Sequence, residues 1–198
     1  MKKMKEHNFP DSSFIGGWYI SESICDEIVS YFKNNKSQHT KGIIGGNNPS
    51  QDYSRKRSID IHMDTDFFIK RFPNYFLEFK QCLELYKKKY THSDKSIYDY
   101  GFYRPVNIQY YKKNWGFKVW HKENDGDPQV ITRHLVFMTY LNDVDDGGTD
   151  FLYQKLTTPA KKGLTLIWPA GWTHTHKGQI SKTKEKYILT SWLDFKKN

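Results

Sequence analysis

From about residue 100 onward the chain consists of short strand-like runs separated by turns, and this pattern constrains the fold more than any other feature. Apolar and polar residues alternate within the runs, and Gly, Asp, Asn and Pro clusters mark their ends, including the Asp-Gly-Gly cluster at 146–148. We expect strands at 103–111, 116–121, 131–142, 149–153, 163–168, 173–177 and 185–195. Such a series predicts an antiparallel sandwich or barrel for the second half of the chain.

The first hundred residues instead show helical periodicity. The segment 21–34 begins at Ser21, a typical N-cap residue, and the segment 74–90 forms a second amphipathic pattern. Between them, residues 35–58 are rich in Asn, Gly, Ser and Lys, which predicts a long loop that acts as a lid or is disordered. Helices followed by strands indicate an α+β chain.

Composition excludes several classes of protein. Aromatic residues make up 17% of the 198 residues, which is incompatible with a wholly disordered chain. Cys25 and Cys82 are the only cysteines, so we expect two buried thiols rather than a disulfide framework or a Cys-rich metal site. No apolar run is long enough to span a membrane, and the first residues lack an apolar signal segment. We therefore expect a cytoplasmic protein, of a bacterium or of a virus-infected host cell, without a membrane partner.

The net charge of +9 raises the question of a nucleic-acid partner. Nearly all the positive charge comes from lysines spread evenly along the chain, and only five residues are Arg. Because Arg makes most bidentate contacts to bases and phosphates, this composition favours a solvated lysine surface over a nucleic-acid site.

Three His-x-acid pairs compete for a metal-binding role: His62/Asp64, His92/Asp94 and His121/Glu123. On a strand, residues two apart share a face, so such a pair can supply two of the ligands of a two-His, one-carboxylate iron site. Chance alone gives roughly one such pair in a chain of this composition. The three candidate pairs must therefore be distinguished by the residues around them.

The surroundings favour His121/Glu123. His92/Asp94 lies in a turn-like stretch and is expected to be solvated. In the 58–64 segment the apolar residues alternate with Asp60, His62 and Asp64, which predicts a polar, exposed strand face. His121/Glu123 follows an aromatic run, 111–120, and lies in the strand-rich half, where a pocket is expected.

The residues alone leave the third ligand open among His134, His174 and His176. Lys186 is the candidate cation for an anionic co-substrate, since alternation along 186–192 places it on one face with Trp192. A lysine that faces into a barrel needs an anion as partner, whereas a lysine at the start of a strand can extend to water. Both interpretations of Lys186 remain open at this point.

The stretch 107–195 resembles the 2-oxoglutarate/Fe(II)-dependent dioxygenases, and within them the prolyl 4-hydroxylase-like branch of small viral or bacterial type. Four features occur in order: Tyr111 ten residues before His121, the triplet His121-Lys-Glu123, the pair of segments Tyr140-Leu-Asn-Asp-Val and Gly147-Gly-Thr-Asp-Phe151, and the run from Trp168 to Gly178 with Lys186 ten residues after His176. The resemblance implies a double-stranded β-helix, a jelly-roll or cupin-like barrel, with supporting N-terminal helices. It also implies a single dioxygenase domain over 1–198, with helical support and a flexible loop in 1–100 and the jelly-roll core in 101–198.

Carried over to this chain, the resemblance assigns Fe(II) to His121, Glu123 and His176. It assigns the far carboxylate of 2-oxoglutarate to Lys186, and hydrogen bonds to that co-substrate to Tyr111 and Tyr140. Trp192 would pack beside these groups, and the glycine pair at 147–148 would form a structural turn.

Two residues of this chain differ from those most common in the wider dioxygenase family. The acidic ligand is Glu123 where the family more often has Asp, and the anchor is Lys rather than the Arg of many other dioxygenases, as in the prolyl 4-hydroxylase branch. A carboxylate at 123 also argues against the halogenating relatives, which lack it.

The implied activity is hydroxylation of an unactivated C–H, with O₂ consumed, succinate and CO₂ as co-products and ascorbate as an accessory reductant. The implied substrate is a prolyl residue of a peptide or protein. Tyr103, Arg104, Trp120 and Trp172 are the candidate substrate-lining residues, and 35–58 is the candidate lid. The alternatives are a nucleic-acid or small-molecule oxygenase of the same superfamily, and a non-catalytic jelly-roll binding module.

Overall fold

The computed structural model describes residues 4–44 and 51–196, which form two antiparallel sheets and three α-helices. The helices are α1 (Glu22–Asn34), α2 (Thr65–Arg71) and α3 (Pro73–Lys89). In spatial order, the large sheet contains β1 (Lys5–Glu6), β2 (Gly16–Tyr19), β10 (Leu164–Pro169), β7 (Arg133–Tyr140), β12 (Lys186–Phe195), β6 (Val106–Tyr111), β4 (Ile59–Met63) and β3 (Thr40–Lys41), with β5 (Tyr100–Gly101) paired to β12. The small sheet contains β11 (His176–Gly178), β8 (Val144–Phe151) and β9 (Leu156–Ala160).

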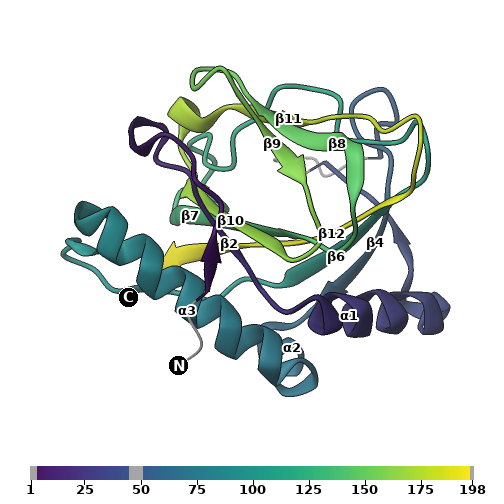
Figure 1. Cartoon of the computed structure of the whole chain (residues 1–198), viewed down its shortest axis with the longest axis horizontal. Coiled ribbons are helices and arrows are strands. Elements are labelled where there is room, and N and C mark those ends of the chain that lie inside the picture. The colour runs from purple at the N-terminus through teal and green to yellow at the C-terminus, as the bar shows by residue number, and fades with distance from the viewer. Residues whose placement is uncertain (1–3, 45–50, 197–198) are drawn as a thin grey trace.

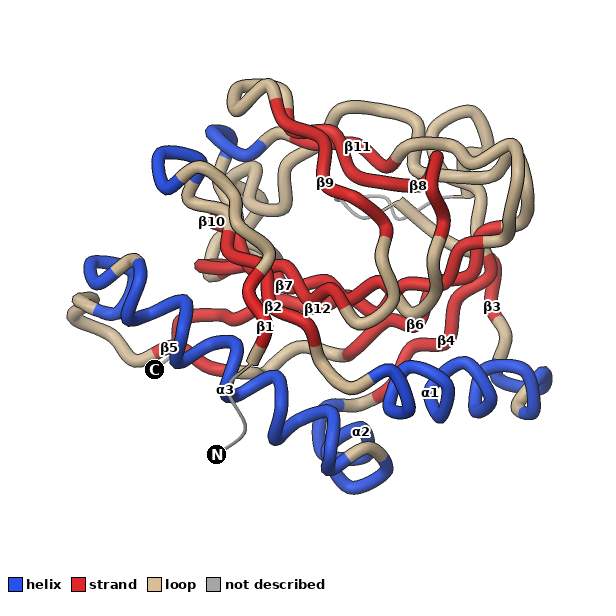
Figure 2. Tube along the Cα trace, viewed as in Figure 1, coloured by secondary structure: helices blue, strands red, loops and turns tan. Residues whose placement is uncertain are grey.

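The two sheets face each other, and all three helices lie on the far side of the large sheet (Figures 1 and 2). Alternate residues of β7 face opposite sides of the large sheet and pack into two different cores. Leu135 and Phe137 belong to the core under the helices, whereas Val136, Met138 and Tyr140 belong to the core between the sheets. The expected α+β class, with antiparallel strands in the second half, is confirmed.

The helix predictions are confirmed, with one helix missed. Helices α1 and α3 match the expected segments 21–34 and 74–90 closely, and Ser21 occupies the N-cap position of α1. Cys25 and Cys82 are buried free thiols, as expected. The missed helix, α2, begins after Asp64, whose carboxylate accepts hydrogen bonds from the backbone N–H groups of Asp66 (3.0 Å) and Phe67 (3.3 Å). Among the described residues, no helix has the length and apolar character needed to cross a bilayer.

Two strand predictions were wrong. Residues 116–121 make only isolated bridges, Lys56 to Phe117 and His121 to His176. The segment 173–177 is a short 3-10 turn over Trp172–His174 followed by β11. The described part of the loop predicted at 35–58 is a loop apart from a 3-10 turn (Lys36–Gln38) and the two-residue β3, and its glycines at 45 and 46 lie outside the described residues. A role of this loop as a lid stays a prediction.

The Asp-Gly-Gly cluster at 146–148 is also not a turn, because it lies inside β8. The pairing of β8 with β9 is irregular between Val144 and Thr149. A β-carbon at Gly148 would collide with the backbone carbonyl oxygen of Thr158. Glycine is therefore needed here for the close approach of two strands.

Packing of α3 on the large sheet gives a direct test of stability. The Phe79 ring is 1% exposed and its centroid lies 4.1 Å from that of Phe137 on β7. We expect Phe79→Ala to lower the free energy of unfolding by about 3–5 kcal/mol, because it leaves a cavity in this layer. Leu77→Ala on the same helix, where the side chain is 57% exposed, should change it by less than about 0.5 kcal/mol. Urea denaturation followed by circular dichroism measures both, and equal effects would contradict the packing described.

Candidate metal centre and its cavity

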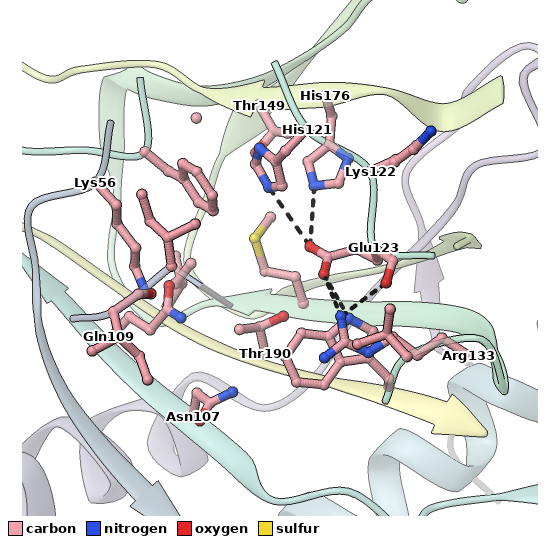
Figure 3. Close-up of a pocket in the computed structure, with 18 of the residues that line it drawn as sticks. Lys56, Asn107, Gln109, His121, Lys122, Glu123, Arg133, Thr149, His176 and Thr190 are labelled. Carbon is pink, nitrogen blue, oxygen red and sulfur yellow. Dashed lines mark hydrogen bonds and ion pairs between the residues drawn. The ribbon is translucent and has the colours of Figure 1, made fainter. Parts of the chain in front are cut away.

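His121, Glu123 and His176 meet at one point between the two sheets. Each offers one ligand atom, and these atoms all lie within 4.8 Å of one another. The Nε2 atoms of His121 and His176 are each 3.6 Å from Oε1 of Glu123. Figure 3 shows both imidazoles pointing at this carboxylate. Backbone pairing creates the meeting point, because His121 and His176 exchange backbone hydrogen bonds of 2.9 Å in each direction.

The two imidazoles present their Nε2 lone pairs to the same space. The Nδ1–H of His121 donates to the carbonyl of Val119 (3.0 Å), and that of His176 donates to the carbonyl of His174 (2.8 Å). Because a neutral imidazole carries only one N–H, this pattern leaves Nε2 of both rings free to bind a cation. The Phe117 ring stacks on His121 at 3.7 Å between ring centroids and fixes its plane.

The electrostatics of the cluster keep Glu123 ionised beside the imidazoles. Burial lowers the pKa of His121, assisted by His176. Burial alone would raise the pKa of Glu123, but hydrogen bonds and charges from His121 and His176 hold it well below its usual range. A carboxylate oxygen and two imidazole nitrogens form the donor set that suits a ferrous ion with open positions.

Arg133 and Trp192 hold the second oxygen of Glu123. Nη1 of Arg133 lies 3.1 Å from Oε2 of Glu123, and Nε1–H of Trp192 donates to the same oxygen at 3.0 Å. The Arg133 guanidinium also stacks 3.7 Å from the centre of the Trp192 ring. Oε1 is thereby left as the oxygen that faces the imidazoles, and the extra length of Glu relative to Asp lets Oε2 reach both donors.

The sequence did not identify Arg133 as part of the site, although it did place Trp192 beside it. Around residue 133 the sequence shows only an Arg beside His134 at the start of an apolar run, and this pattern gives no indication of a contact with Glu123. What places Arg133 over Trp192 is the pairing of β7 with β12, in which Asp194 lies opposite Arg133 and Trp192 opposite Val136. That register cannot be obtained from one strand alone.

Lys186 lies in the same cavity, which has a volume of about 520 Å³. Its side chain is buried, and its ammonium donates to the carbonyls of Gly147 (2.9 Å) and Gln179 (2.8 Å). The alternative that Lys186 extends to water is thus excluded. Burial lowers the pKa of Lys186 to about 8, although Asp146 and Asp150 act in the opposite direction. An ammonium has three N–H groups, so one remains for an anion in the cavity.

The two tyrosines assigned from the sequence also line this cavity. Tyr111 lies opposite Lys186 in the pairing of β6 and β12, and its hydroxyl donates to Oε1 of Gln109 at 2.6 Å. The Tyr140 hydroxyl makes hydrogen bonds to the hydroxyls of Thr149 (2.7 Å) and Thr158 (2.9 Å). Both phenols therefore line the cavity that also holds Lys186 and the metal cluster.

The other histidine candidates are engaged elsewhere. His174 is buried, and its Nε2–H donates to the carbonyl of Ser13 at 2.9 Å. His134 similarly contacts the carbonyl of Ser93 at 2.8 Å. Asp94 pairs with Lys87 at 3.0 Å on the surface, which agrees with a solvated His92/Asp94 pair.

The prediction for the 58–64 strand was correct except at Asp60. Ile61 and Met63 are buried, and His62 and Asp64 are exposed, as expected. Asp60 is instead fully buried and pairs with the buried Lys56 at 2.9 Å. The exposed His62 also lines the cavity, at its mouth.

Of the four residues predicted to line the substrate site, only Arg104 borders the cavity. Its Nε–H donates to Asp194 at 2.9 Å, and Nη2 donates to the carbonyl of Gln129 at 2.5 Å. Tyr103, Trp120 and Trp172 are exposed outside the cavity lining. Trp120 lies under the Lys177 ammonium at 4.5 Å, and Trp172 meets Tyr153 edge-on at 5.8 Å. Contact of these three with substrate stays a prediction.

Comparisons with known proteins agree on one superfamily. No protein-family model matches the chain. Procollagen-lysine,2-oxoglutarate 5-dioxygenase 1 of Bos taurus is 26% identical over 205 residues, covering 97% of this chain and 25% of that protein. The chain thus spans about a quarter of the curated relatives it matches.

Solved structures show the same fold. The viral collagen prolyl hydroxylase of Paramecium bursaria Chlorella virus-1, in its 2-oxoglutarate complex, has a TM-score of 0.68 and 17% identity, covering 96% of this chain and 100% of that one. A prolyl hydroxylase of Trichoplax adhaerens, in complex with a hypoxia-inducible-factor peptide fragment, has a TM-score of 0.71 and 12% identity, covering 93% and 85%. Sequence relatives and structural neighbours alike are 2-oxoglutarate-dependent dioxygenases, which confirms the resemblance expected from the sequence.

The different positions of His174 and His176 predict different consequences of their removal. We expect His176→Ala to abolish binding of a divalent metal, because it removes one of three ligand atoms. His174→Ala should leave metal affinity nearly unchanged while lowering the free energy of unfolding by about 1–3 kcal/mol through the unpaired carbonyl of Ser13. Equilibrium dialysis with Mn²⁺ measures the first property and urea denaturation the second. Equal loss of metal from both variants would contradict the assignment.

Proposed function

We propose that this chain is an Fe(II)- and 2-oxoglutarate-dependent dioxygenase that hydroxylates a prolyl residue of a peptide or protein. The observation that supports this most directly is the presence of a two-His, one-carboxylate cluster and a buried, anion-seeking lysine in one cavity. Either group alone occurs in many proteins, but together they match a metal and a dicarboxylate bound side by side. The two facing sheets would then be the halves of a double-stranded β-helix, and the chain a single catalytic domain.

In this proposal His121, Glu123 and His176 hold Fe(II), and Lys186 pairs with the far carboxylate of 2-oxoglutarate. Tyr111 and Tyr140 lie beside that anion and would donate hydrogen bonds to it from hydroxyls now engaged with Gln109, Thr149 and Thr158. When bound, iron and 2-oxoglutarate would supply the oxidation, in which one oxygen atom of O₂ enters succinate, the other enters the substrate C–H, and CO₂ is released.

The protein's own residues would orient these groups and keep water out. Arg133 and Trp192 fix the carboxylate of Glu123, and the backbone carbonyls of Val119 and His174 fix the two imidazoles. Because these contacts already orient the three ligand side chains, little reorganisation of the metal-binding residues is required when the metal binds. Apolar neighbours such as Met138 and Ile188 line the remaining wall and limit the entry of water.

Prolyl specificity is supported by the fold shared with prolyl hydroxylases of viral and animal origin. A lysyl side chain is the second candidate, because the curated sequence relatives are named procollagen-lysine dioxygenases. A nucleic-acid substrate is disfavoured by the small number of Arg residues.

Mass spectrometry of a peptide library tests the activity and separates the two acceptors. One library carries a fixed central proline and the other a fixed central lysine, with random flanking residues. After incubation with Fe(II), 2-oxoglutarate and ascorbate, we expect a gain of one oxygen on proline and stoichiometric succinate. His176→Ala serves as the matched negative control. Oxygen on lysine alone would replace the prolyl assignment, and no succinate or oxygen gain with either library would refute the dioxygenase.

The lowered pKa of Lys186 predicts how the affinity for 2-oxoglutarate depends on pH. The ammonium is charged below its pKa of about 8 in the free protein and neutral above it. Since only the charged form pairs with a carboxylate, affinity should be constant below pH 8 and fall by up to about tenfold per pH unit above it. Isothermal titration calorimetry on the Mn²⁺-loaded protein measures this. Lys186→Ala should bind weakly at every pH without an inflection, and an unchanged affinity in that variant would remove Lys186 from the role.

A further inference from the structure

A row of polar side chains crosses the wall of the cavity near its mouth. In the pairing of the large sheet, His62 on β4 lies opposite Asn107 on β6, which in turn lies opposite Thr190 on β12. All three line the cavity. Figure 3 shows Asn107 and Thr190 on the opposite side of the cavity from His121 and His176. None of these three residues has a role in the metal or 2-oxoglutarate sites proposed above.

Hydrogen bonding fixes the orientation of two of these side chains. Nδ1–H of His62 donates to Oδ1 of Asn107, because an amide oxygen can only accept. The Asn107 amino group is therefore turned away from His62, and with the ring hydrogen on Nδ1 of His62 its Nε2 is a hydrogen-bond acceptor. Among residues 4–44 and 51–196, neither of these two atoms has a hydrogen-bond partner. The Thr190 hydroxyl, by contrast, donates to the carbonyl of Phe137 at 3.1 Å.

Asn107 is only 7% exposed, so its amino group can reach a partner only through the cavity. The amino group is not sealed in the core, because Asn107 is not among the described side chains with a fully buried, unpaired polar atom, so a ligand or water in the cavity can reach it. The donor of Asn107 and the acceptor of His62 belong to paired residues of neighbouring strands that both line the cavity. One donor and one acceptor are complementary to the main chain of an extended polypeptide, in which the C=O and N–H of the same residue point to the same side.

The row is too far from Lys186 to serve the co-substrate. Asn107 lies four residues along β6 from Tyr111, the residue paired with Lys186, which corresponds to about 13 Å along the strand. A five-carbon dicarboxylate that is anchored at Lys186 and directed at the metal cluster does not extend along β6 over this distance. The row lies instead at the mouth, where His62 is exposed and a polymer can enter.

We propose that His62 and Asn107 form a subsite for the main chain of one extended residue of the polypeptide substrate. Asn107 donates to its carbonyl oxygen, and Nε2 of His62 accepts from its N–H. This inference rests on the proposed function and adds the means by which the main chain of the acceptor is held. Because the nitrogen of a proline residue in a peptide carries no hydrogen, the recognised residue is one other than proline.

The test uses the library peptide that the wild-type protein hydroxylates most, together with ester analogues in which each N–H in turn is replaced by oxygen. We expect Asn107→Leu and His62→Phe each to raise the KM for this peptide about tenfold, the usual effect of removing one hydrogen-bond partner. At one position, replacing the N–H by oxygen should raise the KM of the wild-type protein by a similar factor. The same ester should not raise the KM of His62→Phe any further. His92→Phe, which alters an exposed histidine outside the cavity, is the matched control and should behave as wild type.

A second readout separates this subsite from the co-substrate site. Succinate formation without peptide, and 2-oxoglutarate affinity measured calorimetrically, should be unchanged in Asn107→Leu and His62→Phe. A loss of 2-oxoglutarate affinity in either variant would overturn the proposal, as would a peptide KM equal to that of wild type. A wild-type protein that forms no succinate at all would instead refute the proposed function itself.

Discussion

A buried carboxylate between two imidazoles is the interaction on which the site depends. Glu123 stays ionised in a cavity because its oxygens are divided between partners: Oε2 is held by Arg133 and Trp192, and Oε1 faces His121 and His176. An isolated buried carboxylate would take up a proton instead. The arrangement is thus stable before a metal arrives and leaves the correct atoms available for one.

The sheet architecture makes this possible by giving the large sheet two different faces. One face is apolar and covered by the three helices, which contribute Tyr31, Phe32, Phe68, Tyr75, Phe79 and Tyr86 to the core beneath them. The other carries the charged and polar residues of the cavity, and the small sheet closes over it (Figure 2). Strands with alternating side chains can serve both purposes at once, so stability and chemistry are carried by different residues of the same strands.

Each buried cation near the cavity has a distinct partner. Arg133 pairs with Glu123, Lys56 pairs with Asp60, and Lys186 has only backbone carbonyls. Since a buried cation without a counter-ion is costly, Lys186 is the one that gains most from an incoming anion. The same reasoning explains its lowered pKa and connects the proposed co-substrate to a measurable pH dependence.

Local sequence determined the two long helices, the antiparallel character of the second half, and the set of histidines and acids that could bind a metal, because periodicity and residue chemistry are properties of short segments. The family resemblance then singled out His176, and the tertiary structure shows why His174 differs: a short turn directs it to Ser13. Only the tertiary structure decided that Arg133 meets Glu123, that Asp60 on β4 is buried, and that the exposed His62 lines the cavity. Such contacts depend on strand register and on which face a second sheet covers, and neither is encoded in any single segment.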